Sequence, residues 1–401
     1  MAIGELTIGQ SEYKTRIEKA RVVLRRRRLN ALYLTNPTRI LYTTGFAHIT
    51  TERPIAVVIP QEGPIFFMGP HLERDHVKQD APLISEAHTY PDFPGKVHPM
   101  RFFAKVLARK KLGPGSRIAT DSLQGSAGGW GYRGPALNEL MRETKFTDGR
   151  EIVDGMREVK SPQEIRLLRE SAKWSQVAHD FLMESIEPGM ADVLVGLQAS
   201  SEALGKMLKR LGGRYRQLKW GLSPVVVGFR GQVGPESAIP HAVYTKRKIR
   251  KGDVLVTEAG VEIGGYTSEL ERTVIVGRPS SKATRYFDAM FQAQSAALRE
   301  FRAGAPCARP DEAANKSVRE AGLDNCLRHH TGHGIGLDGH EPPWLDPGDP
   351  TVMAQSMVFS CEPGLYVPGY AGFRHSDTIV VTRNGKEFIT KYPRDLEDLT
   401  V

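Results

Sequence analysis

Cysteines and long apolar runs are scarce in this sequence. Only three of the 401 residues are cysteine (Cys307, Cys326 and Cys361), and no two of them have the close spacing of a metal-binding pair. We therefore expect no disulfide scaffold and a reducing, cytoplasmic environment. No stretch approaches the roughly 18 consecutive apolar residues of a membrane-spanning helix, and residues 1–5 lack the order of a signal peptide. These absences predict a soluble protein that does not contact a membrane.

Nucleic-acid-binding motifs are also missing, although the chain is basic. Lysine and arginine number 55 against 46 aspartates and glutamates, which gives a formal net charge of +9. The longest basic run, residues 25–28, ends a segment with helical periodicity at residues 12–28, where the helix dipole favours cations without any partner. No zinc finger, aromatic RNA-binding motif or glycine-rich phosphate loop accompanies this run. We therefore expect no nucleic-acid partner.

The chain is long enough for two or three domains, and its pattern changes near residue 155. Residues 1–155 alternate short apolar runs with helical stretches, which predicts a smaller α/β domain with a mixed sheet, and residues 36–37 read as a turn. Residues 156–401 begin with a capping box, Ser161 to Glu164, and combine long helices with antiparallel hairpins. The second part is therefore predicted to be an α+β domain.

Three glutamates are expected to meet on one face of a hairpin. Two strand patterns flank a glycine turn that we centre on residues 263–264. This register pairs Glu258 with Glu269, and strand alternation puts Glu271 on the same face as Glu269. Buried like charges are unfavourable by several kcal/mol unless cations lie among them. The alternative is a solvated outer face on which the glutamates pair with arginines.

Two further segments favour chemistry over a solvated face. Residues 329–341 contain four histidines and four glycines, and clustered imidazoles serve as metal ligands or proton carriers. Glycines at such a site let the backbone approach a ligand closely. Glu362 ends an apolar strand pattern, which adds another carboxylate. The set predicts an active site built from carboxylates and histidines.

These segments resemble the superfamily of creatinase, prolidase and methionine aminopeptidase, the pita-bread hydrolases. The resemblance spans the whole chain and is carried by residues 332–336 (GHGIG), residues 361–366 (CEPGLY) and a domain-junction signature at residues 156–165. It implies a pita-bread catalytic domain of the α+β class at residues 156–401. A smaller creatinase-type α/β domain is implied at residues 1–155.

The resemblance also implies positions for metal ligands. Metal-dependent members hold two ions with Asp, Asp, His, Glu and Glu, and the matching positions here are Glu258, Glu269, His333, Glu362 and Ser376. Because serine stands at the bridging position, two ions are not expected. A single Zn²⁺, Mn²⁺ or Co²⁺ on Glu269, His333 and Glu362 is one alternative. His375 could replace the lost donor only if a bulge turned it to the face of Ser376.

The departures from the metal-dependent pattern resemble creatinase, which works without metal. Its active-site glutamate matches Glu271, its catalytic histidine matches His241, and its second glutamate matches Glu362. An arginine that reaches the substrate carboxylate in a neighbouring subunit matches Arg53, which implies a homodimer. Ser376 departs from this pattern as well, because creatinase has a histidine there.

The preferred hypothesis is hydrolysis of a C–N bond in a small cationic amidine or amide, without a cofactor. Glu271 and Glu362 would hold the cation, and His241 would carry a proton from water to the leaving nitrogen. His333 and His340 would orient groups or stabilise the intermediate. One alternative is a metal-dependent Xaa-Pro dipeptidase or aminopeptidase P-like peptidase, in which a metal polarises the carbonyl of a dipeptide. Another is a pita-bread domain that binds a partner without catalysis.

Overall fold

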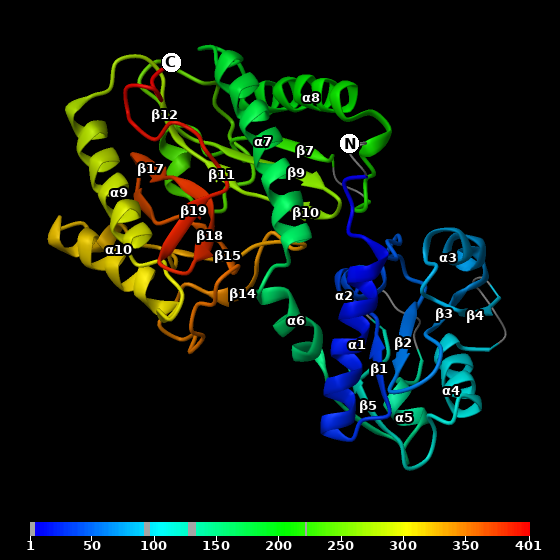
Figure 1. The fold of residues 1–401 in the computed structure, drawn as a ribbon. Coiled ribbons are helices and arrows are strands. Elements are labelled where there is room, and N and C mark those ends of the chain that lie inside the picture. The colour runs from blue at the N-terminus through cyan, green and yellow to red at the C-terminus, as the bar shows by residue number, and fades with distance from the viewer. Residues whose placement is uncertain (1–4, 92–96, 127–133, 221–222) are drawn as a thin grey trace. The chain divides into compact units, whose positions relative to one another are not determined.

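The computed structural model describes residues 5–91, 97–126, 134–220 and 223–401 (Figure 1). The chain forms two compact units, and the division between their main spans falls between Arg157 and Glu158. Residues 218–220 belong to the first unit, and the segment ending at Thr7 belongs to the second. Over the described ranges, no helix has both the length and the apolar character needed to cross a membrane.

The first unit is built on the mixed sheet expected for an α/β domain. Six strands follow the order β4-β3-β2-β1-β5-β6, in which β1 runs antiparallel to β2 and parallel to β5. Helix α4 buries Phe103 and Leu107 against Tyr33 of β1 in the core of this unit. The elements are α1 (Gln10–Arg27), β1 (Ala31–Leu34), α2 (Pro37–Thr44), β2 (Ala56–Pro60), β3 (Phe66–Pro70), α3 (Arg74–Asp80), β4 (Glu86–Tyr90), α4 (Pro99–Arg109), β5 (Arg117–Thr120), α5 (Leu137–Leu140), β6 (Lys145–Asp148) and α6 (Arg150–Glu158).

The turn predicted at residues 36–37 is instead the start of helix α2. The side chain of Asn36 accepts a hydrogen bond from the backbone N–H of Arg39 at 3.1 Å and caps the helix. Pro37 occupies the first turn, where its fixed φ suits a helix and its missing N–H is not needed. The prediction was wrong because an Asn-Pro pair suits a helix start as well as a turn.

The second unit holds a nine-stranded sheet with helices packed against it. The main path is β10-β9-β11-β18-β15-β13-β14, while β7 pairs with β9 and β19 pairs with β18. Helices α7 and α8 contact β9 and β7, whereas α9 contacts β15 to β17. Figure 1 shows α9 on a different side of the strands from α7 and α8. The elements are α7 (Pro162–Glu184), α8 (Asp192–Leu211), β7 (Val225–Gly228), β8 (Val254–Val256), β9 (Glu258–Ile263), β10 (Tyr266–Thr267), β11 (Leu270–Glu271), β12 (Thr273–Ile275), α9 (Ser281–Arg299), α10 (Ala308–Glu320), β13 (Gly332–Gly334), β14 (Glu341–Trp344), β15 (Val358–Cys361), β16 (Gly364–Val367), β17 (Ala371–Arg374), β18 (Ser376–Thr382) and β19 (Gly385–Phe388), with short 3-10 turns between some of them.

The capping box predicted at the start of α7 is present. The Ser161 hydroxyl accepts from the backbone N–H of Glu164 at 3.2 Å, and the Glu164 side chain accepts from the backbone N–H of Ser161 at 2.9 Å. The next turns of α7 reach the glutamate-bearing strands, because the Ser171 hydroxyl accepts from the backbone N–H of Ser268 at 2.8 Å. This hydrogen bond holds the hairpin against α7.

The hairpin that carries the glutamates turns one residue later than predicted. Its turn consists of Gly264 and Gly265, whose φ angles are 59° and 87°, and Tyr266 pairs with Ile263. Two consecutive left-handed residues are what a type I′ hairpin turn requires, and glycine adopts that conformation without strain. The predicted centre at residues 263–264 would have placed a β-branched isoleucine in one of these positions.

This turn changes which glutamates face one another. Leu270 lies opposite Ala259, so Glu271, rather than Glu269, comes opposite Glu258. The predicted pairing of Glu258 with Glu269 was therefore wrong by two residues. Because side chains alternate with a period of two, a shift of two residues leaves all three glutamates on one face.

His179 gives the second unit a pH-dependent contribution to stability. It is fully buried on α7, and its Nε2 lies 2.8 Å from Thr257 Oγ1. Burial, assisted by the charge of Arg272, lowers the pKa of His179 to about 3. The unfolded chain binds a proton here near pH 6.5, whereas the folded chain does not. This contribution is therefore present above about pH 6.5 and is lost as the pH falls towards 3.

Replacing His179 by glutamine should make folding less sensitive to acid. Between pH 7.5 and pH 5, the wild-type free energy of unfolding should fall by about 2 kcal/mol more than that of His179→Gln. Urea unfolding at the two pH values measures both losses, and the exposed control His241→Gln should behave like the wild type. Equal losses in the wild type and His179→Gln would contradict a buried neutral imidazole.

Candidate active site

One face of the nine-stranded sheet carries several of the predicted site residues. His333 on β13 lies opposite Ser360 on β15, and Glu271 on β11 lies opposite Ser376 on β18. Ser360 also pairs with Thr378, which is two residues along β18 from Ser376. Residues that pair directly or stand two apart on a strand share a face. The sheet register therefore brings distant parts of the sequence together.

Glu271 and Arg374 form a buried ion pair with two contacts. Arg374 Nε and Nη2 donate to the two carboxylate oxygens of Glu271, and each side chain is only 3% exposed. Arg374 also donates to the Tyr366 hydroxyl at 3.0 Å and to Gln232 Oε1 at 3.3 Å. Burial raises the pKa of Glu271, and the guanidinium group of Arg374 opposes that rise. The matched fork geometry favours the charged pair.

Glu258 and Glu269 are stabilised in different ways. Glu258 forms an ion pair with Nε of Arg230, whose side chain is 41% exposed. Burial raises the pKa of Glu258, and the charge of Arg230 opposes this effect. Glu269 instead accepts hydrogen bonds at Oε1 from the hydroxyls of Ser360 and Ser376, the second at 2.6 Å. Ser376 therefore binds a neighbouring carboxylate.

His333 carries a positive charge beside two carboxylates. Its Nδ1 donates to the Gly334 carbonyl at 3.0 Å, and Nε2 lies 3.1 Å from Glu362 Oε1 and 4.0 Å from Glu269 Oε2. Burial disfavours the charged ring, but the contact with Glu362 and the charges of Glu269 and Glu362 raise the pKa of His333 to about 9. Burial of Glu362 is likewise outweighed by His333 and Arg374, which lower its pKa to about 2. The pair is therefore ionised at neutral pH.

His340 is the accessible imidazole of the site. Its side chain is exposed, and its ring stacks on His333 with centroids 3.7 Å apart and an interplanar angle of 20°. Burial of part of the ring and the charge of His333 lower the pKa of His340. Since an ordinary histidine titrates near pH 6.5, His340 is neutral at pH 7. A protonated and a neutral imidazole therefore lie side by side.

His329 and Tyr366 are linked to Arg374 by a chain of hydrogen bonds. His329 Nδ1 lies 2.7 Å from the His330 carbonyl, which can only accept, so His329 Nε2 is the nitrogen that accepts from the Tyr366 hydroxyl at 2.8 Å. The Tyr366 oxygen in turn accepts from Arg374. This chain of hydrogen bonds fixes the guanidinium plane that holds Glu271.

The donor set does not fit a pair of metal ions. Glu258 is held by Arg230, and the Ser376 hydroxyl donates to Glu269, so two of the five implied ligand positions are not free donors. In their ionised forms Glu258, Glu269, Glu271 and Glu362 carry one charge more than Arg230, Arg374 and protonated His333, and burial works against that excess because it raises the pKa of Glu258 and raises that of Glu271 to about 8. Two divalent ions would overcompensate that charge.

A single ion fits the donor set better. Ligand atoms of Glu269, His333 and His340 lie within 4.8 Å of one another, as do those of Glu269, Glu271 and Glu362. His333 Nε2 is buried and, despite its closeness to Glu362, is not aligned for a hydrogen bond. A backbone carbonyl on the other ring nitrogen is the usual arrangement for a metal-ligating histidine. Glu269, His333 and His340 could therefore hold one divalent ion.

Three more residues were considered from the sequence: His241, Arg53 and His375. His241 is exposed and forms no hydrogen bond or ion pair within the described part of the chain. Arg53 belongs to the first unit and forms an ion pair with Glu52 at 2.7 Å, so its action on a neighbouring chain stays a prediction. His375 is fully buried, with its ring 5.2 Å from that of Phe287 on α9. It does not join the donors around Ser376.

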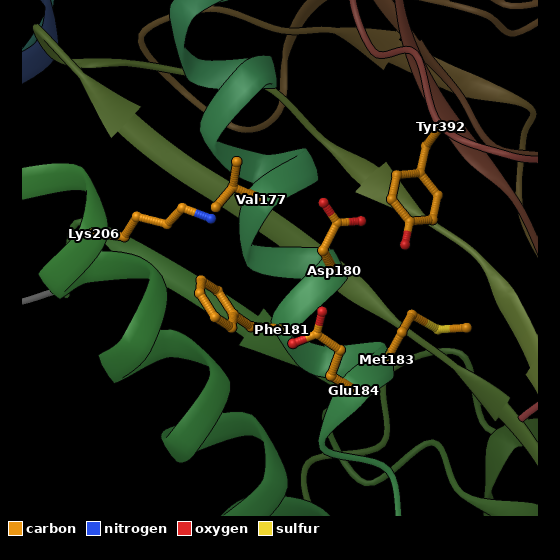
Figure 2. A pocket seen from close by; sticks show the side chains of 7 residues that line it. All are labelled: Val177, Asp180, Phe181, Met183, Glu184, Lys206 and Tyr392. Carbon is orange, nitrogen blue, oxygen red and sulfur yellow. The ribbon is translucent and has the colours of Figure 1, made fainter. Parts of the chain in front are cut away.

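A separate hollow on the surface of the second unit carries none of the cluster residues. Its volume is about 290 Å³, and Figure 2 shows its side chains projecting from α7, α8 and the C-terminal segment. Asp180 and Glu184 contribute negative charge and Lys206 contributes positive charge, so the hollow has no dominant sign. The lining residues are Val177, Asp180, Phe181, Met183, Glu184, Lys206 and Tyr392. The hollow and the carboxylate cluster therefore share no residue.

Sequence reasoning missed the arginines of the cluster. Arg374 lies within the segment that contains Ser376, and Tyr366 ends the CEPGLY segment, but neither side chain has a spacing that reveals its partner. Arg230 follows β7 in a glycine-rich loop and looks like an ordinary surface cation in the sequence. The available signal was the electrostatic requirement itself, because buried glutamates need cations nearby.

Comparisons with known proteins confirm the resemblance and the pita-bread fold. The model of "Metallopeptidase family M24" matches residues 166–383, more than half of the chain, and that of the "Creatinase/Prolidase N-terminal domain" matches residues 16–159. "Probable dipeptidase PepE" of Mycobacterium tuberculosis is 30% identical over 376 residues, 92% of each chain. The "Xaa-Pro dipeptidase" of Pyrococcus horikoshii is 30% identical over 65% of this chain and 71% of its own length.

Solved structures agree with these matches. Dipeptidase PepE from Mycobacterium ulcerans superimposes with a TM-score of 0.81 at 27% identity and covers 98% of this chain and 100% of its own. The Xaa-Pro dipeptidase from Bacillus anthracis gives a TM-score of 0.78 at 25% identity, with 97% and 100% covered. Both likenesses extend over the two units of the chain.

Removing Arg374 should destabilise the fold, because it leaves the carboxylate of Glu271 buried without a partner. We expect Arg374→Met to lower the free energy of unfolding by about 3–5 kcal/mol. The double variant Glu271→Gln, Arg374→Met should recover much of that loss, since it removes the carboxylate of Glu271 together with its partner. Urea unfolding measures both variants.

The exposed pair Arg169–Glu387 supplies the control, and Arg169→Met should change stability little. If Arg374→Met resembled this control, Glu271 would not be the buried charged partner that the geometry indicates.

Proposed function

Because the chain belongs to metallopeptidase family M24, we propose that it hydrolyses a C–N bond, and that its substrate is a small cationic amidine or amide. The observation that carries this proposal is the fork of Arg374 on Glu271. It places a permanent positive charge of the protein inside the cluster that would otherwise need metal ions. Together with Arg230 it supports catalysis with the chain's own charges.

The remaining negative charge favours a monocationic substrate. Glu269 and Glu362 keep carboxylate oxygens near His333, so two carboxylates face one protonated imidazole. An amidinium group carries one positive charge and N–H donors that match carboxylate oxygens. Its central carbon would then lie close to the two stacked imidazoles.

The imidazoles would divide the proton transfers of hydrolysis. Neutral His340 would take a proton from water while the water oxygen bonds to the carbon of the C–N bond. Charged His333 would donate a hydrogen bond to the atom that gains electron density. The proton on His340 would then pass to the leaving nitrogen as the C–N bond breaks. We assign this role to His340 because its ring stacks on that of His333, and the role of His241 stays a prediction.

A panel of small amides, amidines and guanidines tests this proposal. With chelator present, proton NMR should detect C–N cleavage of at least one compound by the wild type. In the variant Glu362→Gln, the kcat for cleavage of that compound should fall by roughly 100-fold or more, because the charged partner of His333 is lost. The exposed control Glu397→Gln should retain full activity. Complete loss of wild-type turnover upon chelation, with recovery on adding metal, would contradict the proposal.

A second candidate is a peptidase that uses one metal ion. It is favoured by the convergence of Glu269, His333 and His340 and by the dipeptidase names of the relatives. A bound ion would polarise the scissile carbonyl and lower the pKa of a water molecule. His333 would have to lose its proton to bind the ion, so binding would release a proton at neutral pH.

Xaa-Pro dipeptides assayed with Mn²⁺, Co²⁺ or Zn²⁺ test this second candidate. It predicts cleavage that requires the ion and that falls by about 100-fold or more in His340→Gln, which removes one donor. His88→Gln in the first unit is the matched control and should behave like the wild type. The absence of cleavage with all three ions would eliminate the candidate.

A further inference from the structure

A buried lysine and a buried glutamate form an ion pair in the second unit. Lys160 Nζ lies 2.9 Å from Glu341 Oε1, and the two side chains are only 1% and 3% exposed. Glu341 directly follows His340 in the chain and begins β14. Two charges that are taken out of water lose their hydration, so a buried pair is a poor source of stability by itself. Its position beside His340 therefore suggests a role in the active site.

The backbone of Lys160 is held in place. Its N–H donates to the Ser356 carbonyl at 3.0 Å. The next residue, Ser161, is the N-cap of α7, and all three residues around this point belong to the domain-junction signature of residues 156–165. The ammonium group of Lys160 therefore extends from a fixed part of the fold.

The loop between β13 and β14, residues 335–340, packs around this ion pair. Glu341 Oε2 accepts from the backbone N–H of Asp338 at 3.3 Å. A Cβ on Gly336 would lie 2.8 Å from Glu341 Oε1 and 3.3 Å from Lys160 Cε, so the loop backbone approaches both side chains closely. The ion pair therefore holds the conformation of this loop.

Regular strand pairing does not set the position of His340. The residue precedes β14, and the register between β13 and β14 shifts between His333 and Gly334. The His340 side chain is exposed, yet its ring stacks on that of His333 with centroids 3.7 Å apart. An exposed side chain outside a strand keeps such a contact only if its backbone is held in place by surrounding groups. The loop that ends in His340 and the carboxylate of Glu341 provide this support.

We propose that Lys160 is a positioning residue for the active-site imidazoles. Through Glu341 it holds the loop that ends in His340. The ring of His340 thereby stays stacked on that of His333. The inference rests on the proton-transfer role of His340 in the proposed function and adds the group that orients it. Lys160 acts through the loop and takes no part in the proton transfers.

Nuclear Overhauser cross-peaks between histidine rings measure this geometry directly. With isotope-labelled histidine and chelator present, the full-length wild type should show cross-peaks between ring protons of His333 and His340, and His340→Gln should remove them. Lys160→Met should abolish these cross-peaks. The double variant Lys160→Met, Glu341→Met should regain the wild-type melting temperature, because neither charge of the pair remains, and should still lack the cross-peaks. The control Lys316→Met, which breaks an exposed lysine–glutamate pair, should keep them.

The kinetic effect of Lys160→Met provides a second readout. For a compound that the wild type cleaves, kcat should fall by roughly tenfold to 100-fold, because a displaced catalytic group reacts slowly. KM should stay within about twofold, since the groups that bind the substrate are unchanged. A purely stabilising lysine would change neither value in a variant that remains folded.

The outcomes separate this proposal from the proposed function. Cross-peaks that persist in folded Lys160→Met or in the double variant would overturn the positioning role, whatever the activity. Loss of the cross-peaks with an unchanged kcat would overturn the catalytic role of His340 and leave Lys160 as the residue that orients its ring. If the wild type cleaves no compound of the panel, the proposed function fails, and the cross-peaks alone decide the role of Lys160. Loss of both the cross-peaks and turnover supports the proposal.

Discussion

The concentration of negative charge on one buried sheet face is the constraint on which the rest of this site depends. Strand register fixes Glu258, Glu269 and Glu271 on a common face, and Glu362 joins them from the end of β15. Carboxylates cannot be buried together unless their charge is compensated. In this chain the compensation comes from guanidinium groups, a protonated imidazole and two serine hydroxyls.

The cations of this site are not what one would expect from the names of the chain's relatives. Those names describe dipeptidases, and the family model is that of a metallopeptidase. Here Ser376 donates to Glu269, Arg230 holds Glu258, and Arg374 holds Glu271, so protein cations stand among the carboxylates. The shared fold therefore does not fix the chemistry of this chain, since function depends on the site rather than on the fold.

Much of the fold and part of the site could be predicted from the sequence. The capping box at Ser161 and the shared face of the glutamates depend on local spacing, which the sequence displays. The hairpin register was missed by two residues, because either of two overlapping glycine turns fits the pattern. The partners of Arg230 and Arg374 could not be predicted, since their contacts depend on loops and strands far apart in the chain.

The central claim is that protein cations replace a pair of metal ions in neutralising the carboxylate cluster. It is tested most directly by the number of Mn²⁺ ions that the purified, chelator-treated chain binds, measured by equilibrium dialysis at neutral pH. We predict fewer than two ions per chain, because Arg230 and Arg374 already compensate two of the four glutamates. Two ions per chain, each bound with micromolar affinity, would contradict this account.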